Sequence, residues 1–172
     1  MCEVTNLAAT YGEYAIATGA SSGIGEEFAR HLSSVGLNVV LVARRIDRLQ
    51  RLAGELSDAY DTHTIVLALD LLADGAVAEL HRRVAHLDIG IVVVNAAMST
   101  TGPLVNNSLS EELAVLRLDG AVPLETAHRF GRDFARRRRG AIILVASSLE
   151  AGQILCNGQT CATSQITTPR PS

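Results

Sequence analysis

A glycine-rich loop near the amino terminus carries the strongest chemical signal in this sequence. It reads TGASSGIG over residues 18–25 and separates a short apolar run from an amphipathic stretch that begins near Glu26. Glycines at such a point allow a tight turn, a close approach of the backbone to a diphosphate, and close packing of helix against strand. Free backbone N–H groups at the start of the helix then bind the phosphates. An ordinary strand-to-helix turn is the alternative, but the strand before the loop and the helix after it favour a dinucleotide site.

Two arginines stand where a dinucleotide fold contacts the ribose of adenosine. Arg44 and Arg45 end the second apolar run, and Arg44 lies nineteen residues after Gly25. A carboxylate at this point favours NAD, whereas an arginine accommodates the 2′-phosphate of NADP. No acidic residue ends this run, so the sequence favours NADP (NADPH) as the cofactor. The alternative is that both arginines simply begin a solvated helix together with Arg48 and Arg51.

Short apolar runs must position these residues. The runs have five to seven residues each and span 14–18, 37–43, 64–69, 89–94 and 141–146. Their almost complete lack of polar side chains is typical of parallel strands that are covered on both faces.

Longer amphipathic stretches separate the runs. Apolar residues at helical spacing predict helices over 26–35, 47–60, 74–86 and 110–134. Asp47 and Ser110 mark the expected starts of two of them. The alternation predicts an α/β fold, a doubly wound Rossmann-type parallel sheet of about five strands with right-handed crossovers.

Composition and charge bound the class of protein. The chain has 172 residues, 48% of them hydrophobic, and a mean hydropathy of +0.23, which predicts one folded domain. A net charge of −3 argues against nucleic acid or a membrane surface as partner. No segment reaches the roughly 18 apolar residues of a membrane helix. Cys2, Cys156 and Cys161 form neither an even framework nor a CxxC pair. We therefore expect a cytoplasmic protein without disulfides or a metal site.

From about Tyr14 to Leu149 the sequence resembles the short-chain dehydrogenase/reductase family. Its TGASSGIG matches the TGxxxGxG cofactor loop of that family in full. The resemblance implies that Asp70 and Leu71 contact the adenine, that Asn95 belongs to a variant of the NNAG motif, and that Arg44 selects NADP. The cofactor-binding residues expected from the loop and the resemblance are Gly19, Ser21, Ser22, Gly23, Ile24, Gly25, Arg44, Asp70, Leu71, Asn95 and Ala96.

The catalytic motif of the family is only partly present. The family uses an Asn, a Ser, and a Tyr and Lys spaced as YxxxK. The resemblance places Asp119 at the Asn and Ser147 at the catalytic Ser, with Ser148 as a one-residue slip. Thr160 and Ser164 stand where the Tyr and Lys belong.

The composition offers no substitute for this pair. All 15 basic residues are arginines, so the sequence contains no Lys, and its last Tyr is Tyr60. A phenol donates a proton near neutral pH only when a nearby ammonium lowers its pKa, and a threonine hydroxyl is far less acidic. We expect an NADP-dependent oxidoreductase for carbonyl and alcohol interconversion that is catalytically impaired or inactive as written. The alternative is a non-enzymatic NADP-binding or partner-binding module.

The end of the sequence differs in composition from the rest. Residues 14–149 predict the Rossmann domain, whereas residues 150–172 predict an atypical polar tail that is poorly ordered. By the resemblance the chain is truncated and lacks the C-terminal strands of the family. The run 141–146 would then be an apolar sheet edge, which calls for a covering partner or a homo-oligomer. The other expected partner is a small carbonyl or alcohol substrate.

Two further features are expected to be structural. The run Arg136–Arg139 predicts a solvated turn at a helix end, where basic residues favour the helix dipole. Phe130 and Phe134, one helical turn apart, are expected in the core or in a dimer contact.

Overall fold

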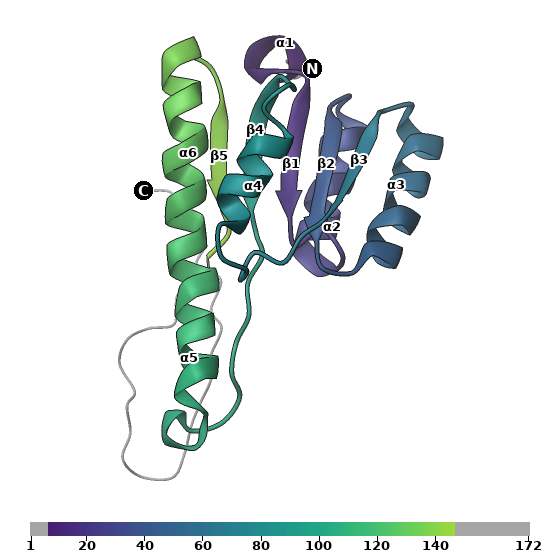
Figure 1. Ribbon diagram of the computed structural model, residues 1–172. Coiled ribbons are helices and arrows are strands. Elements are labelled where there is room, and N and C mark those ends of the chain that lie inside the picture. The colour runs from purple at the N-terminus through teal and green to yellow at the C-terminus, as the bar shows by residue number, and fades with distance from the viewer. Residues whose placement is uncertain (1–6, 147–172) are drawn as a thin grey trace, which may run out of the picture.

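A parallel β-sheet forms the centre of the molecule (Figure 1). The computed structural model describes residues 7–146, and its five strands are ordered β3-β2-β1-β4-β5. The strands are β1 (Tyr14–Thr18), β2 (Asn38–Ala43), β3 (Thr64–Ala68), β4 (Ile89–Val94) and β5 (Ala141–Leu144). Every pairing between neighbours is parallel. The predicted Rossmann-type α/β fold is therefore confirmed.

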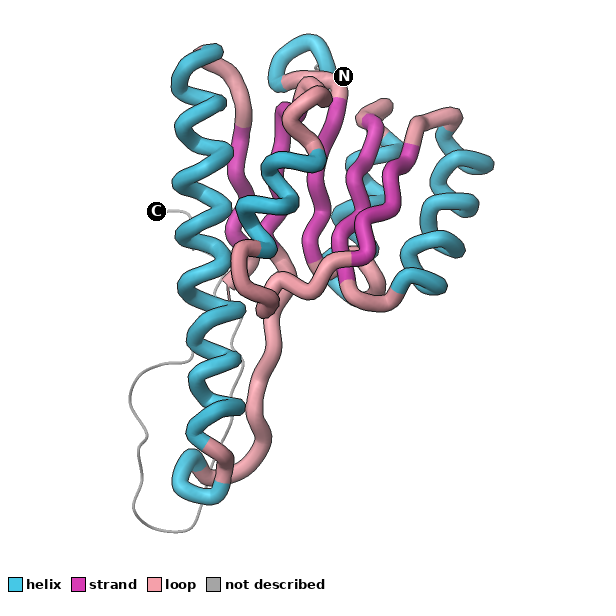
Figure 2. Tube along the Cα trace, in the orientation of Figure 1, coloured by secondary structure: helices cyan, strands magenta, loops and turns pink. Residues whose placement is uncertain are grey.

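Helices connect the strands and follow the predicted order (Figure 2). They are α1 (Leu7–Tyr11), α2 (Gly23–Ser34), α3 (Ile46–Tyr60), α4 (Ala76–Arg83), α5 (Leu109–Leu116) and α6 (Val122–Arg137). The sequence did not predict α1. The single helix expected over 110–134 consists of α5 and α6, joined by a π-helical turn at Arg117–Ala121, and the three form one continuous rod in Figure 2.

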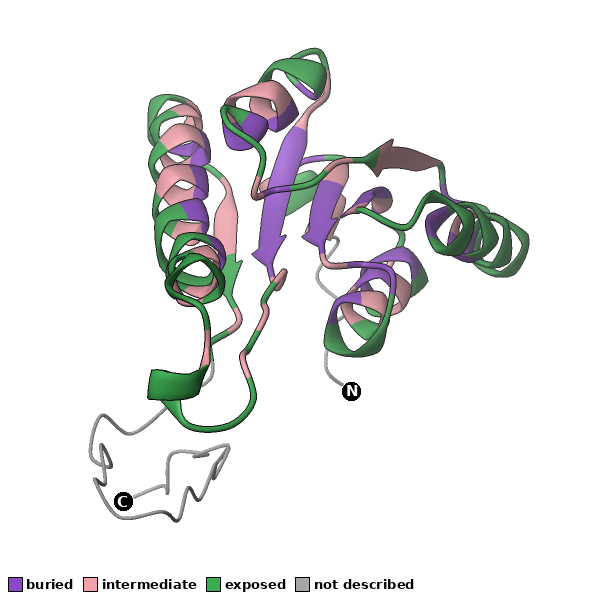
Figure 3. Ribbon diagram, turned by 60° about the horizontal axis from the view of Figure 1, so that its bottom comes forward, coloured by how far each residue is buried: buried purple, intermediate pink, exposed green. Residues whose placement is uncertain are grey.

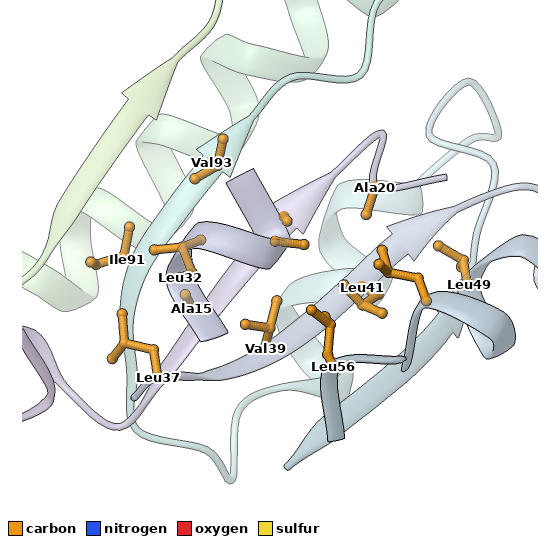
Figure 4. Packing of buried hydrophobic residues seen from close by; sticks show 13 residues of the cluster. Ala15, Ala20, Leu32, Leu37, Val39, Leu41, Leu49, Leu56, Ile91 and Val93 are labelled. Carbon is orange, nitrogen blue, oxygen red and sulfur yellow. The ribbon is translucent and has the colours of Figure 1, made fainter. Parts of the chain in front are cut away.

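The sheet is covered on both faces by apolar side chains. Ala15 and Ala17 of β1 pack on one face with Leu32 of α2 and with Leu49 and Leu56 of α3, as Figure 4 shows for most of these residues. Ile16, which points the other way, packs with residues of α4 and α6. Figure 3 shows the buried central strands between helices whose outer faces are exposed. Burial on both faces explains why the strands read as continuous apolar runs.

The start of α5 differs from the prediction. Ser108, and not Ser110, is the N-cap: its Oγ accepts a hydrogen bond from the Glu111 backbone N–H at 3.3 Å. The Glu111 carboxylate in turn accepts from the Ser108 backbone N–H at 3.2 Å, which completes a capping box. Asp47 likewise lies inside the first turn of α3 and does not cap it, because α3 begins at Ile46.

The arginine run ends α6 as predicted, but it is only partly solvated. Arg137 and Arg139 both donate to the carboxylate of Asp88, which directly precedes β4. Phe130 and Phe134 lie in the core, at 3% and 8% exposure. These contacts fix α6 against the sheet.

One edge of the described sheet is β5, which is shorter than the predicted run 141–146, and the other edge is β3. β5 pairs with β4 only, and Ile143 and Leu144 are 36% and 54% exposed. The predicted tail, residues 150–172, lies outside the described residues. Between residues 7 and 146, no helix is long and apolar enough to cross a bilayer. The same residues contain no cluster of three or more potential metal ligands.

Candidate nucleotide-binding site

The carboxyl ends of four strands open onto one crevice. β1 lies between β2 and β4. The chain runs from β1 through β2 to β3 on one side and then crosses back to β4 on the other side. Ligands of doubly wound sheets bind at such a switch point. A cavity of about 260 Å³ lies there, lined by the loops that follow β1, β2, β3 and β4. Seven of the predicted cofactor residues line it: Gly19, Ser22, Arg44, Asp70, Leu71, Asn95 and Ala96. Ser21, Gly23, Ile24 and Gly25 belong to the same loop without lining the cavity.

The glycines of the loop allow a close approach between β1 and β4. Gly19 has a φ of +68°, which favours glycine. A Cβ on Gly25 would lie 2.5 Å from the Gly19 carbonyl oxygen and 2.6 Å from Asn95 Nδ2, closer than real Cβ atoms come. Only glycine therefore fits at residue 25, and the helix begins at Gly23 with its first N–H groups facing this loop. A glycine-rich turn between a strand and a helix is the arrangement at which doubly wound folds bind a diphosphate.

Thr18 joins the two central strand ends, a contact that the sequence did not reveal. Its buried Oγ1 accepts hydrogen bonds from the backbone N–H groups of Asn95, at 2.9 Å, and of Ala96, at 3.1 Å. The available signal was a hydroxyl at the last position of an otherwise apolar strand. This contact fixes the loop after β4 beside the glycine-rich loop.

The two arginines after β2 differ in their surroundings. Both line the cavity and both are exposed, but they differ in their hydrogen bonds. Arg45 donates from Nη2 to Ser21 Oγ at 2.9 Å and to Ser22 Oγ at 2.8 Å, and from Nε to Ser21 Oγ at 3.2 Å. Arg48 and Arg51 are exposed on α3. The alternative interpretation, a solvated helix, expected this exposure for these two residues. The sequence had not singled out the contact of Arg45 with the loop.

Asp70 and Leu71 border the crevice at the end of β3. The Asp70 Oδ1 accepts from the Leu72 backbone N–H at 3.0 Å, which holds the turn. Leu71 is buried against Val77 of α4 and Leu118 of the π-helical turn. Asp70 and Leu71, predicted to lie at the adenine, are thus on a hydrogen-bonded turn that lines the same cavity as the arginines.

A second cavity, of about 600 Å³, adjoins the first and shares Ala96, Ala97 and Met98 with it. Its walls are mostly apolar, with the carboxylates of Glu112 and Asp119. Asp119 Oδ1 accepts from the Met98 backbone N–H at 3.2 Å, so the residue expected at the family's Asn position does reach the loop after β4.

The remaining predicted catalytic positions follow Ala146 in the sequence. Ala146 is the last described residue, and it lines this cavity. Ser147, the predicted catalytic serine, lies outside the described residues, and so do Thr160 and Ser164.

A family model and curated proteins are similar to this chain. A family model described as short chain dehydrogenase matches residues 13–161. The 7beta-hydroxysteroid dehydrogenase of Collinsella aerofaciens is 31% identical over 154 residues, which cover 90% of this chain and 59% of that protein. The "Inactive hydroxysteroid dehydrogenase-like protein 1" of Homo sapiens is 28% identical over 145 residues, covering 83% and 44%. The chain thus spans less than two thirds of these curated relatives.

Solved structures show the same arrangement of elements. A 7beta-hydroxysteroid dehydrogenase superposes with a TM-score of 0.80 at 31% identity, covering 83% of this chain and 55% of that one. A metagenomic short-chain oxidoreductase in complex with NADP gives a TM-score of 0.77 at 29% identity, with 85% and 67% covered.

Proposed function

Because the chain belongs to the short-chain dehydrogenase family, we propose that it is an NADP-dependent oxidoreductase of that type, impaired in catalysis as its sequence stands. The observation that carries this proposal is the convergence of the glycine-rich loop, the two arginines and Asn95 on one crevice. A second support is that similar solved proteins contain NADP or NADPH. The proposed reaction is the interconversion of a carbonyl and an alcohol.

The residues of the crevice divide the binding of NADP among them. The backbone N–H groups of the loop 18–25 and of the start of α2 would hold the diphosphate. Arg44 would bind the 2′-phosphate, because a guanidinium pairs well with phosphate oxygens. Asp70 and Leu71 would border the adenine, and Asn95 with Ala96 the nicotinamide end. NADPH supplies the hydride when it is bound.

The weak point of the proposed enzyme is proton transfer. Ser147 would polarise the substrate oxygen, but Thr160 and Ser164 replace the phenol and the ammonium of the family. General acid–base catalysis contributes roughly 10²–10⁴ in rate, and a threonine hydroxyl cannot supply it near neutral pH. Hydride transfer without a positioned acid would be correspondingly slow.

The expected partners follow from the surfaces beside the site. The apolar cavity next to the nicotinamide end suits a small carbonyl or alcohol with an apolar body. A homo-oligomer or a covering partner would protect the exposed residues of β5 and a row of exposed leucines on the rod, namely Leu109, Leu113, Leu116 and Leu124. A cytoplasmic location remains part of the proposal.

Turnover measurements test the proposed impairment. The unaltered chain should consume NADPH at the background rate over a panel of ketones and aldehydes. The double variant Thr160→Tyr/Ser164→Lys restores the YxxxK spacing and should react faster. Thr163→Tyr/Ser164→Lys adds the same residue types at the wrong spacing and should not.

The outcomes separate the proposal from its alternative. Turnover by the unaltered chain as fast as that of the Thr160→Tyr/Ser164→Lys variant would contradict the impairment. Thermal stabilisation by NADPH, with no turnover from the chain or from the YxxxK variant, would favour the non-enzymatic binding module. No stabilisation by any nucleotide would contradict the cofactor site itself.

A further inference from the structure

The guanidinium of Arg45 is held in a fixed orientation across the mouth of the glycine-rich loop. Nε and Nη2 donate to Ser21 Oγ and Ser22 Oγ over 2.8 to 3.2 Å. Ser21 is 7% exposed, so its hydroxyl is itself fixed by the packing around it. Three of the five N–H donors of the guanidinium are thereby occupied, and the two on Nη1 have no partner within residues 7–146.

The partners of Arg45 leave its charge uncompensated. Most arginines of the described chain that form side-chain hydrogen bonds donate to carboxylates, as Arg82 does to Glu79 and Arg117 to Asp74. Arg45 bonds only to neutral hydroxyl oxygens, and no ion pair involves it within residues 7–146. An oriented positive charge with free donors therefore lines the crevice. Such a group is ready to bind an anion.

We propose that Ser21 and Ser22 are positioning residues, which set the preference for NADP over NAD by holding Arg45 toward the 2′-phosphate. This inference rests on the NADP binding proposed above. In this proposal the two hydroxyls orient Arg45 by accepting its hydrogen bonds, whereas the sequence analysis expected the serines to bind the cofactor themselves. It also makes Arg45 a second phosphate-binding residue beside Arg44.

Pre-organisation explains why the hydroxyls matter. A free arginine side chain loses rotamer entropy when it is fixed, and a side chain that is already held loses less on binding. Arg44 lines the cavity without a hydrogen bond of its own among the described contacts. The hydroxyls of Ser21 and Ser22 should therefore raise the affinity for a 2′-phosphate through Arg45. They should leave NADH, which has no 2′-phosphate, unaffected.

A double-mutant cycle tests this inference. The dissociation constants of NADPH and NADH would be measured by calorimetry for the unaltered chain, Ser22→Ala, Arg45→Gln and the double variant. Arg45→Gln should weaken NADPH binding about tenfold, which corresponds to about 1.4 kcal/mol, because it removes charge-assisted hydrogen bonds to the phosphate. Ser22→Ala should weaken NADPH binding about threefold, a fraction of that effect, and leave NADH unchanged. In the Arg45→Gln background, Ser22→Ala should have no further effect.

The controls and contrary results are specific. Ser22→Thr keeps the hydroxyl and should bind NADPH like the unaltered chain. Ser34→Ala removes a hydroxyl that bonds the His31 carbonyl far along α2, and should change neither constant. Additive effects of Ser22→Ala and Arg45→Gln would show direct contact of Ser22 with the cofactor and overturn the positioning role. An unchanged ratio of the NADPH and NADH dissociation constants in Ser22→Ala would also overturn the positioning role. If the unaltered chain bound neither nucleotide, the proposed function would fail as well.

Discussion

Single atoms at the strand ends determine the shape of the crevice. The Thr18 hydroxyl holds two N–H groups of the loop after β4, and the missing side chain of Gly25 lets that loop approach. Arg45 adds a third connection, from the end of β2 to the glycine-rich loop. Each contact joins segments that are distant in sequence, so the site depends on a few small groups.

Replacing Gly25 tests the close approach directly. In Gly25→Ala the new methyl would meet backbone and side-chain atoms at 2.5 to 2.6 Å, so the loop must shift. We expect a loss of roughly 1–3 kcal/mol in the free energy of unfolding, together with weaker NADPH binding. Urea denaturation and calorimetry would measure the two effects.

Gly54→Ala is the matched control. Gly54 lies within α3, where a Cβ would meet nothing within 4 Å. There the same substitution should stabilise the chain by roughly 0.5–1 kcal/mol. Equal effects at residues 25 and 54 would show that the crevice does not need the glycine.

Sequence and structure agree at this scale where a motif fixes the position of a residue. Asn95 and Asp70 follow strand ends, and a parallel sheet brings strand ends together, so their place in the crevice could be predicted. The contacts of Thr18 and Arg45 could not, because they depend on which hydroxyl and which guanidinium face each other across loops. No periodicity encodes that choice.

Among the elements, the rod formed by α5 and α6 bears on the site through the π-helical turn that carries Asp119. Apolar spacing predicted the rod but not its first residue, because the sequence analysis placed the start at Ser110 and the structure has Ser108 as the N-cap. The capping box decides for Ser108, because Glu111 stands three residues after it. Similarly, spacing could not foresee the change from α-helix to π-helix.

Serine substitutions at the start of α5 test the cap. Ser108→Ala should lower the free energy of unfolding by about 1 kcal/mol, the usual cost of losing an N-cap. Ser110→Ala should change it by less than about 0.5 kcal/mol, as exposed positions usually do. The reverse order in chemical denaturation would contradict the cap at Ser108.

The cap also has a pH dependence. Hydrogen bonds from Ser108 lower the pKa of Glu111. Because the pKa of Glu111 is lower in the folded state, the ionised carboxylate stabilises the fold at pH values above the pKa of the unfolded chain. This stabilisation is lost as the pH falls through the pKa of the folded chain. Ser108→Ala should therefore weaken the loss of stability in acid.

The whole molecule combines a crevice that we propose to bind NADP with a catalytic region that is only partly described. The order β3-β2-β1-β4-β5 creates the switch point, and the alternating runs were enough to predict the fold. The chain spans 59% of its Collinsella aerofaciens relative, and the predicted catalytic serine lies just beyond the described residues. The strongest structural support therefore concerns nucleotide binding.

Calorimetric titration of the unaltered chain with NADPH and with NADH tests that claim most directly. The arginines at the end of β2 predict that NADPH binds at least about tenfold more tightly, which corresponds to about 1.4 kcal/mol. NADPH at 100 times its dissociation constant should also stabilise the fold by about 2.7 kcal/mol. Equal affinity for the two nucleotides would contradict the proposed role of the arginines, and no binding of either would contradict the site as a whole.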